Sequence, residues 1–526
     1  MLDSPGVMVP RSDDDPLAVA TDPAMVLPRR VRWWAQEDPD RPFMTEVTGR
    51  TATYGEFWDE VRRWATLLRA HGVAPGDRVL SMLPSSIDAQ ALWLGAGCIG
   101  AMDVPVNFEL RGTFLDHALC DPGSVLCFTR PEHVGIPAAS NVPGIQVVGV
   151  ERDGSLTSDL EPTDLGELPM PGDPSCIIYT SGTTGPSKGV VVRWAQMSAT
   201  IGRIPRSWFS ADDVVYAYHP MFHITGRSPM PSMTDVGGRL VLRERFSASE
   251  FWDDVRRLGC TSTTVNTSLL LGAPERDDDR DNPLRIAFTA GNRAHANRFA
   301  QRFGVQMAEC YGSTEAGFPI VLREFPTDGS RPCGWLRRGY EARIVDDAGV
   351  EVPHGDSGEL LIRPPAPEMI LREYFNAPEQ TAEALVDGWY HTGDRLRRRD
   401  DGGFEFVDRI KDTIRRMGEN ISSVALEAAV LADPDVVECA AIGVPDPVTG
   451  QDVMIVVVPH PAAVESFDPA QFAERLAESL PKYMRPEYVV VVDELPRTPN
   501  NKVRKVGLLA TLDLTSPRAW RRPARR

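Results

Sequence analysis

Apolar and polar positions along the chain predict helices and strands in alternation. From residue 54 the apolar side chains recur at intervals of three and four and stop at Gly72, which predicts an amphipathic helix (Tyr54, Phe57, Val61, Trp64, Leu67, Leu68). Short apolar runs such as "DRVLSML", "DVVYAYHP", "LRIAFTA" and "VQMAECYG" follow, separated by helix-like stretches at 87–94 and in "ASEFWDDVRRL". Buried strands that alternate with helices predict an α/β fold, with a large N-terminal domain of layered, mostly parallel sheets.

The pattern changes near "VDRIKDTIRRMGENISS" (407–423), where charged residues and glycine interrupt the apolar runs. The helix "VALEAAVLA", the strands "VVECAAIGV" and "DVMIVVVP" and the helix "AQFAERLAESL" follow, and they predict a small α+β domain. We therefore expect an N-terminal domain at 1–407 with a flexible tail at 1–25, a hinge at 408–411, and a C-terminal lid domain at 412–526. The alternative is one continuous domain with a charged surface loop.

Composition narrows the class of protein. At 526 residues, two or more domains are expected, and 42% hydrophobic with 25% charged residues is typical of globular chains. The formal net charge of −18 argues against nucleic-acid binding. We see no apolar run of about 18 residues and no signal peptide. The eight cysteines form no CxxC pair, which favours reduced thiols and a cytoplasmic location.

One stretch of small hydroxyl and glycine residues, "YTSGTTGPSKG" (179–189), joins two apolar runs. Glycines let backbone N–H groups approach an anion closely, hydroxyls add donors, and Lys188 adds a positive charge. This composition is suited to a phosphate tail, although the spacing is not that of the GxxxxGK[ST] loop. The alternative is a solvated turn.

Five further blocks accompany this loop: "YGSTEAG" (311–317), "GELLIRP" (358–364), "WYHTGDRL" (389–396), "DRIKDTIRRMGENIS" (408–422) and "LPRTPNNKVRK" (495–505). Together, in this order, they resemble the acyl-adenylate-forming superfamily of acyl-CoA synthetases, luciferases and peptide-synthetase adenylation domains. The segment "PMFHITG" (220–226) is most similar to the acid-CoA ligase branch. The resemblance covers about residues 30–510.

The resemblance implies a role for each block in binding ATP. The loop would hold the β- and γ-phosphates through Thr180, Ser181, Gly182, Thr183, Thr184, Gly185 and Lys188. Glu315 would hold Mg²⁺, a hard cation suited to carboxylate oxygen, and Thr314 would reach the α-phosphate. The adenine would lie against Tyr311, Gly312, Ser313 and the backbone of Ala290, Gly291 and Asn292. Taken alone, Glu315 is equally consistent with an exposed loop carboxylate.

The remaining blocks imply ribose contacts and a moving domain. Asp394 would accept hydrogen bonds from the ribose hydroxyls, and Arg409 would add a second contact. Lys502 matches the family's adenylation lysine, although "NNK" replaces the usual "GK" before it. Lys411 matches the hinge position and Gly418 would face the thiol channel. The alternatives are a surface lysine at 502 and a helix-stop glycine at 418.

The acid pocket departs from the family pattern. "HITGRSPMP" and "FTAGNRAHANRF" place Arg227 and Arg293 where relatives usually have apolar or small residues. Because a buried arginine requires a partner, we expect an acid that is small, aromatic or polar. It would be small or carry a second polar or anionic group, and it would not be a long fatty chain. The alternative is that either arginine points to solvent. His223 would shape the entrance, and Gly312 would line the pocket.

These observations predict an ATP-dependent, AMP-forming ligase, with ATP and Mg²⁺ as cofactors and CoA as the expected second substrate. One alternative is an adenylating enzyme of secondary metabolism that passes an activated acid or oxyacid to an amine or a carrier protein. Another is a non-catalytic nucleotide-binding scaffold. The chain is expected to be a monomer or a homodimer.

Overall fold

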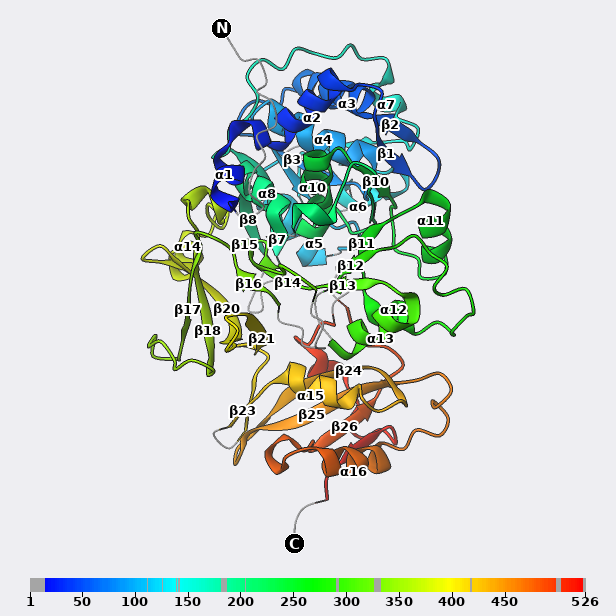
Figure 1. Cartoon of the computed structure of the whole chain (residues 1–526), viewed down its shortest axis with the longest axis vertical. Coiled ribbons are helices and arrows are strands. Elements are labelled where there is room, and N and C mark those ends of the chain that lie inside the picture. Colours follow the sequence, from blue (N-terminus) through cyan, green and yellow to red (C-terminus); the bar gives the residue numbers. More distant parts are fainter. Residues whose placement is uncertain are drawn as a thin grey trace.

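The computed structural model describes residues 15–110, 112–124, 126–138, 140, 142–180, 187–203, 205–289, 293–325, 333–416, 419–497 and 503–523. Figure 1 shows a large α/β part, an antiparallel sheet at its side, and a small C-terminal domain at one end. This arrangement confirms the predicted α/β fold with a smaller C-terminal domain.

Two mainly parallel sheets form the α/β part. The first has the order β6 (Gln146–Gly149), β5 (Leu126–Thr129), β3 (Arg78–Met82), β4 (Met102–Pro105), β7 (Pro174–Thr180) and β8 (Lys188–Arg193). The second has the order β13 (Gln306–Ala308), β12 (Ile286–Phe288), β11 (Ser262–Thr264), β9 (Val214–Ala217), β10 (Arg239–Leu242), β1 (Pro42–Glu46) and β2 (Thr51–Thr53). Within these sheets the pairs β7–β8 and β1–β2 are antiparallel.

Helices accompany the strands of this part, as the sequence pattern predicts. They are α2 (Leu27–Glu37), α3 (Tyr54–Ala70), α4 (Ile87–Cys98), α5 (Gly112–Cys120), α6 (Gly135–Ala138), α7 (Ser155–Ser158), α8 (Trp194–Ala199), α9 (Ile224–Arg227), α10 (Pro229–Val236), α11 (Phe251–Leu258), α12 (Thr267–Leu271) and α13 (Arg293–Phe303). Within the described ranges, no helix is both long and apolar enough to cross a membrane.

Local sequence signals explain where α3 begins and ends. Thr53 and Glu56 form a reciprocal capping box, which satisfies backbone donors of the first turn. The predicted stop at Gly72 coincides with a left-handed backbone (φ 80°). The apolar face of α3 packs on α4, a helix that is buried on all sides.

The region between the two domains is antiparallel, which differs from the mostly parallel pattern of the rest. It contains β14 (Cys310–Ser313), β15 (Gly317–Val321) and β16 (Trp335–Leu336), and a second sheet of β17 (Glu341–Val345), β18 (Ser357–Arg363), β20 (Trp389–Arg398), β19 (Leu385–Val386) and β21 (Phe404–Arg409). Helix α14 (Pro378–Ala384) precedes β19. Antiparallel neighbours such as β14–β15 and β20–β21 need no crossover helix between them.

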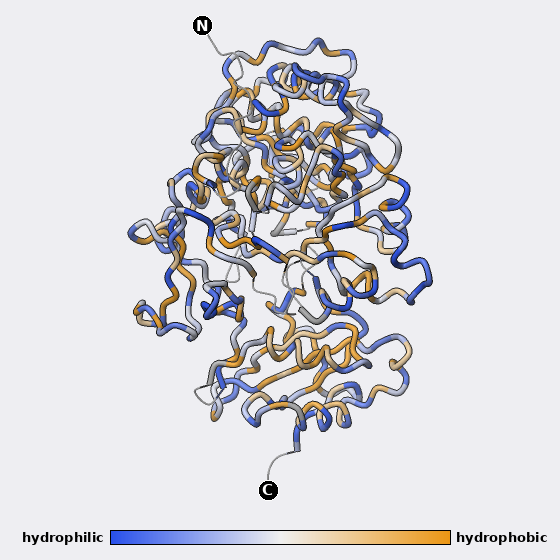
Figure 2. Tube along the Cα trace, in the orientation of Figure 1, coloured by the Kyte–Doolittle hydropathy of each residue, from blue (hydrophilic) through white to orange (hydrophobic). Residues whose placement is uncertain are grey.

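The C-terminal domain has its own sheet and core. Its strands are β22 (Ile414–Arg416), β23 (Glu419–Ile421), β24 (Val436–Asp446), β25 (Gly450–Pro459), β26 (Tyr488–Val491) and β27 (Ala519–Arg521), with helices α15 (Ser423–Val430), α16 (Pro469–Ser479) and α17 (Leu508–Thr511). Figure 2 shows hydrophobic residues along its central strands. Residues 410–413 connect β21 to β22 and include part of the predicted hinge.

A flexible tail was expected over residues 1–25, but the structure is ordered before residue 25. Residues 16–25 form helix α1 (Pro16–Thr21) and the short turn η1 (Pro23–Met25). Asp15 caps α1, Ala20 is fully buried, and α1 contacts α8. The helix is short and has one turn of apolar residues, so its sequence alone gives little sign of packing.

Candidate active site

Three residues predicted to contact the nucleotide meet between β14, β20 and β21. The Tyr311 hydroxyl donates a hydrogen bond to Asp394 Oδ2 at 2.8 Å, and Arg409 Nε lies 3.5 Å from Asp394 Oδ1. Asp394 and Arg409 are direct partners in the β20–β21 register. Burial, and then the charge of Asp394, raises the pKa of Tyr311 well above its ordinary value, so its hydroxyl stays a neutral donor.

Glu315 is a half-buried carboxylate in the turn between β14 and β15. Its Oε1 accepts a hydrogen bond from the Tyr374 hydroxyl at 3.2 Å, and its carbonyl accepts one from Gln196 Nε2 at 3.1 Å. Burial raises the pKa of Glu315, while the Tyr374 hydrogen bond and the charge of Arg409 oppose the shift. Among the residues that the structure describes, no lysine or arginine lies within ion-pair distance of this carboxylate.

Three positively charged side chains, Lys188, Arg409 and Lys411, interact electrostatically in this region. Lys188 is the first residue of β8, and its Nζ lies 4.9 Å from the centroid of the Tyr374 ring. Burial, and then the charges of Lys188 and Arg409, lowers the pKa of Lys411. Lys188 and Arg409 therefore both repel the charge of Lys411, and a bound polyanion would relieve this repulsion.

The β14–β15 hairpin requires the residue types that the motif carries. A Cβ at Gly312 would lie 2.4 Å from the carbonyl oxygen of Gly317, so only glycine is accommodated there. Ser313 Oγ accepts a hydrogen bond from the Ala316 N–H at 3.0 Å, and the carbonyl of buried Thr314 accepts one from a buried glutamine, Gln196.

The glycine-rich stretch connects the antiparallel strands β7 and β8. Thr180 pairs with Lys188 at the last position of the ladder, and its hydroxyl lies 3.4 Å from the Lys188 carbonyl oxygen. Several predicted residues lie outside the described part of the chain: Ser181, Gly182, Thr183, Thr184, Gly185, Ala290, Gly291, Asn292, Gly418 and Lys502. Their roles stay predictions.

Arg227 does not take the position expected of an acid-binding residue. It is fully buried, forms an ion pair with Asp103, and donates from Nε to the Met221 carbonyl at 2.9 Å. Its guanidinium lies 4.5 Å from the centroid of the Trp93 ring. Because Asp103 already supplies the balancing charge inside the core, neither the substrate anion nor solvent is its partner.

His223 has a structural contact that the sequence pattern did not reveal. It is the N-cap of α9, and its Nδ1 accepts a hydrogen bond from the Thr225 N–H at 3.2 Å. Arg293 begins α13, but its side chain lies outside the described atoms, so its expected contact with Arg227 stays a prediction.

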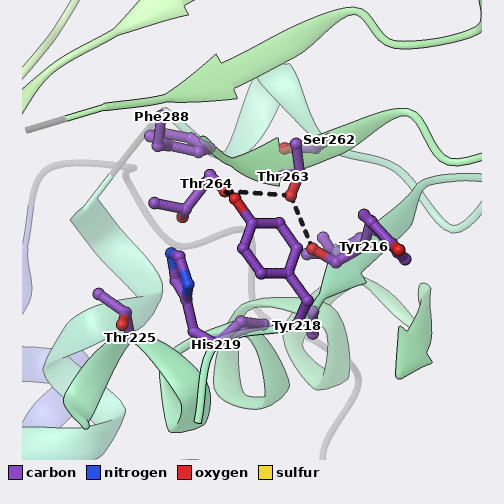
Figure 3. Close-up of a pocket in the computed structure, with 11 residues that line it drawn as sticks. Tyr216, Tyr218, His219, Thr225, Ser262, Thr263, Thr264 and Phe288 are labelled. Carbon is purple, nitrogen blue, oxygen red and sulfur yellow. Dashed lines mark hydrogen bonds between the residues drawn. The ribbon is translucent and has the colours of Figure 1, made fainter. Parts of the chain in front are cut away.

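A small cavity with both polar and apolar lining residues lies at the carboxyl ends of β9 and β11, next to α9. Its volume of about 10 Å³ has room for roughly one water molecule. Figure 3 shows Tyr218, His219 and Thr225 around it, with Phe288 at its far side. The Tyr218 hydroxyl donates to the Thr264 carbonyl at 2.6 Å. Among the residues that line it there is no arginine or lysine.

Sequence reasoning missed two residues that contact the candidate active site. Tyr374 links the carboxylate of Glu315 to the ammonium of Lys188, and Gln196 holds the backbone of Thr314 and Glu315. Tyr374 lies in the segment "REYFNAPEQ". Nothing in this local sequence distinguishes a tyrosine of the active site from an aromatic residue of the core.

Fold and site together define an adenylate-forming type of enzyme. Residues 31–375 match the family model described as AMP-binding enzyme, and residues 425–502 match the AMP-binding enzyme C-terminal domain. The chain belongs to the AMP-binding enzyme family, which confirms the resemblance inferred from the motifs.

Individual relatives agree along most of the chain. A sulfoacetate–CoA ligase of Cupriavidus necator is 31% identical over 92% of this chain and 97% of its own. A crotonobetaine/carnitine–CoA ligase of Salmonella paratyphi A is 31% identical over 87% of this chain and 93% of its own. Among solved structures, ATP-bound MatB from Rhodopseudomonas palustris superposes with a TM-score of 0.81 and 26% identity, covering 91% of this chain and 97% of that one.

Proposed function

We propose that this protein is an ATP-dependent acid–CoA ligase. It converts a carboxylic acid and ATP into acyl-AMP and pyrophosphate, and then transfers the acyl group to the thiol of CoA. One observation carries the proposal. The carboxylate Glu315, the hydrogen-bonded pair Asp394–Tyr311 and the cations Lys188 and Arg409 lie together near the start of β8, where the glycine-rich stretch ends. Two relatives with 31% identity are CoA ligases, which supports the choice of acceptor.

The first half-reaction requires that negative charge be neutralised. Lys188 and Arg409 both repel Lys411 in the free protein, and the triphosphate would lie among the three. Thr180, the last residue of β7, precedes the β7–β8 loop that would hold the β- and γ-phosphates. Lys502 would bridge the attacking carboxylate and the α-phosphate, close to Thr314.

Glu315 fits the role of a Mg²⁺ ligand. Its carboxylate is half-buried, is oriented by Tyr374 and has a pKa raised by burial, so a divalent cation would stabilise its charged form. Mg²⁺ in nucleotide sites commonly takes one or two carboxylates together with substrate phosphates and water. The metal would supply electrostatic stabilisation of the phosphate oxygens.

The nucleoside would be held by the Tyr311–Asp394–Arg409 group. Asp394 would exchange its present partners for the ribose hydroxyls, and Tyr311 would then lie against the base. The second half-reaction would need the C-terminal domain to turn about 408–411, with Lys411 at the hinge and Gly418 beside the thiol channel.

The acid is proposed to be short and polar. The cavity beside α9 is small and is lined by hydroxyl groups, His219 and apolar side chains such as Val215 and Phe288, which favours a short acid over a long alkyl chain. Arg227 is removed from the set of anion-binding candidates by its pairing with Asp103. The names of the relatives refer to short polar acids, sulfoacetate and crotonobetaine or carnitine.

The direct test is to incubate the protein with MgATP, CoA and a panel of acids from two to sixteen carbons, with polar and apolar members, and to detect acyl-CoA by mass spectrometry. We expect thioester formation with short polar acids. AMP release only in the presence of an amine or a carrier protein would identify another acceptor. A preference for the long alkyl acids would contradict the proposed acid class.

A further inference from the structure

Helix α5 (Gly112–Cys120) ends beside strands β7 and β8, at the end of their ladder that the glycine-rich stretch joins. Two polar residues of this helix end, His117 and Asp121, are four positions apart and therefore lie on the same face, one turn from each other. The Asp121 N–H donates to the His117 carbonyl at 2.9 Å, so the helical turn continues through Asp121. The sequence motifs include neither residue.

His117 contacts the residue that precedes Lys188. Its Nε2 lies 2.9 Å from the carbonyl oxygen of Ser187. Because a carbonyl oxygen only accepts hydrogen bonds, Nε2 carries the proton and donates. The imidazole also meets the Tyr179 ring edge-on, with centroids 5.9 Å apart and planes at 86°. His117 therefore fixes the backbone immediately before Lys188, whose ammonium lies over the Tyr374 ring.

Asp121 contacts the opposite strand of the same ladder. Its Oδ2 accepts a hydrogen bond from the Tyr179 hydroxyl at 2.5 Å. Burial, and then this hydrogen bond, raises the pKa of Tyr179 well above its ordinary value, so the hydroxyl stays a neutral donor. Tyr179 pairs with Gly189 one position before the final Thr180–Lys188 pair. Asp121 therefore holds the strand that faces Lys188.

A third segment is tied to the same helix end. Asn376 Nδ2 donates to the Asp121 carbonyl at 2.9 Å, and Asn376 has a left-handed backbone (φ 53°), which asparagine tolerates better than most residues. Backbone hydrogen bonds join the residues just before it to β8. They include Tyr374, whose hydroxyl donates to Glu315. The end of α5 thus contacts the supports of both the carboxylate and the cation of the candidate active site.

We propose that the last turn of α5 positions Lys188 for the β- and γ-phosphates of ATP. His117 holds the strand end that carries Lys188, and Asp121 holds the facing strand end through Tyr179. Lysine has a long, flexible stem, so a fixed backbone reduces the freedom that its ammonium loses when a phosphate binds. His117 and Asp121 are positioning residues that act through Lys188. The inference rests on ATP as the substrate in the proposed function.

Nucleotide binding tests this role without any reaction. Calorimetry in the presence of Mg²⁺ compares α,β-methylene-ATP, which has β- and γ-phosphates, with AMP, which lacks them. His117→Phe keeps a ring and loses the donor, whereas His117→Gln keeps an N–H donor at a similar reach. His71→Phe is the matched control, because His71 Nδ1 also lies 2.9 Å from a backbone carbonyl oxygen, at the end of α3.

We expect His117→Phe to bind α,β-methylene-ATP roughly tenfold more weakly than wild type, since one hydrogen bond to a charged group is worth about that factor. Its Kd for AMP should stay at the wild-type value, because AMP has no β- and γ-phosphates. His117→Gln and His71→Phe should bind both nucleotides as wild type does. An equal loss for both nucleotides, or His117→Gln as weak as His117→Phe, would overturn the assignment.

Tyr179→Phe tests the facing strand end and removes only a hydroxyl group. It should show the same selective loss of triphosphate affinity, and in pyrophosphate exchange both variants should have a KM for MgATP about tenfold above wild type. Transfer from supplied acyl-AMP to CoA should keep its wild-type rate. Wild-type affinity for α,β-methylene-ATP in both His117→Phe and Tyr179→Phe would overturn the assignment. If wild type makes no CoA thioester but the selective loss is observed, the proposed acceptor reaction fails and the role of α5 stands.

Discussion

Tyr374 is the residue that connects the opposite charges of the candidate active site. Its hydroxyl donates to Glu315 and its ring lies under the ammonium of Lys188. Its own pKa is raised, first by burial and then by the charge of Glu315, so the hydroxyl remains protonated at neutral pH. Tyr374 is therefore a positioning residue for both a carboxylate and a cation.

Replacing Tyr374 by phenylalanine should shift the pH dependence of adenylation. Glu315 already has a raised pKa, and the tyrosine hydrogen bond opposes that shift. Its loss should raise the pKa further, so the carboxylate protonates at higher pH and the acid limb of the pyrophosphate-exchange profile moves upward. Tyr483→Phe, at an exposed position, is the matched control. An unmoved acid limb with a normal KM for MgATP would contradict this role.

Arg227 was the residue whose position sequence reasoning placed wrongly. An arginine in a segment next to a presumed pocket has the same pattern whether it binds substrate or pairs within the core. The pairing depends on Asp103, which is 124 residues away in sequence and reaches Arg227 only after β4 and α9 have packed. No local signal carries that information.

The Arg227→Met variant should lose stability without a change in acid preference. Removal of one member of a buried pair leaves Asp103 uncompensated, at roughly 3–5 kcal/mol of unfolding free energy. Urea unfolding measures the loss, and adding Asp103→Asn should restore part of it. A stable variant with altered acid specificity would return Arg227 to the substrate pocket.

At the scale of elements, the hairpins and helices near the site were largely predictable. The motif "YGSTEAG" coincides with the β14–β15 turn, where the close approach at Gly312 demands glycine. The periodic stretch at 54–68 coincides with α3 because an amphipathic stripe and a capping box agree. The antiparallel sheet at 341–409 was harder to predict, since its strands have mixed exposure and no regular alternation.

The junction of the two domains contains a network that the motifs did not indicate. Asp408, at the end of β21, accepts hydrogen bonds from Ser423 N at 2.6 Å and Ser423 Oγ at 3.1 Å. Lys505 Nζ donates to the same Ser423 Oγ at 2.6 Å and lies 2.7 Å from Glu427 Oε1. The network joins β21, α15 and the segment that follows Lys502.

Lys505→Met should destabilise the protein in a pH-dependent way. Burial raises the pKa of Glu427 and the charge of Lys505 opposes the shift. Without the lysine, that pKa rises further, so the deficit of roughly 2 kcal/mol at pH 7.5 should shrink as pH falls and Glu427 takes up a proton. Urea unfolding at several pH values is the measurement, with the exposed Lys482→Met as control. A deficit that is constant with pH would argue against the pairing.

At the scale of the whole molecule, the two domains divide the chemistry. The N-terminal part brings together Lys188, Glu315 and Asp394, whereas Lys502 belongs to the C-terminal domain and lies outside the described residues. The family, the class of fold and the domain order were predictable because six motifs occur in sequence. The identity of the acid was not, because residues such as Arg227 acquire their partners only on folding.

The Lys502→Ala variant tests the division of labour between domains. We expect adenylation to fall by at least about 100-fold, because a charge that stabilises the transition state is lost. Transfer from supplied acyl-AMP to CoA should be largely spared, since the lysine is then withdrawn from the site. Equal loss in both half-reactions would contradict the alternation of domains.

The exchange of labelled pyrophosphate into ATP tests the central claim most directly. Wild-type protein with MgATP and a suitable short polar acid should incorporate label, and Glu315→Gln should reduce the rate at least about 100-fold and raise the MgATP requirement. A wild-type protein that incorporates no label with any acid, or a Glu315→Gln variant as active as wild type, would contradict the account.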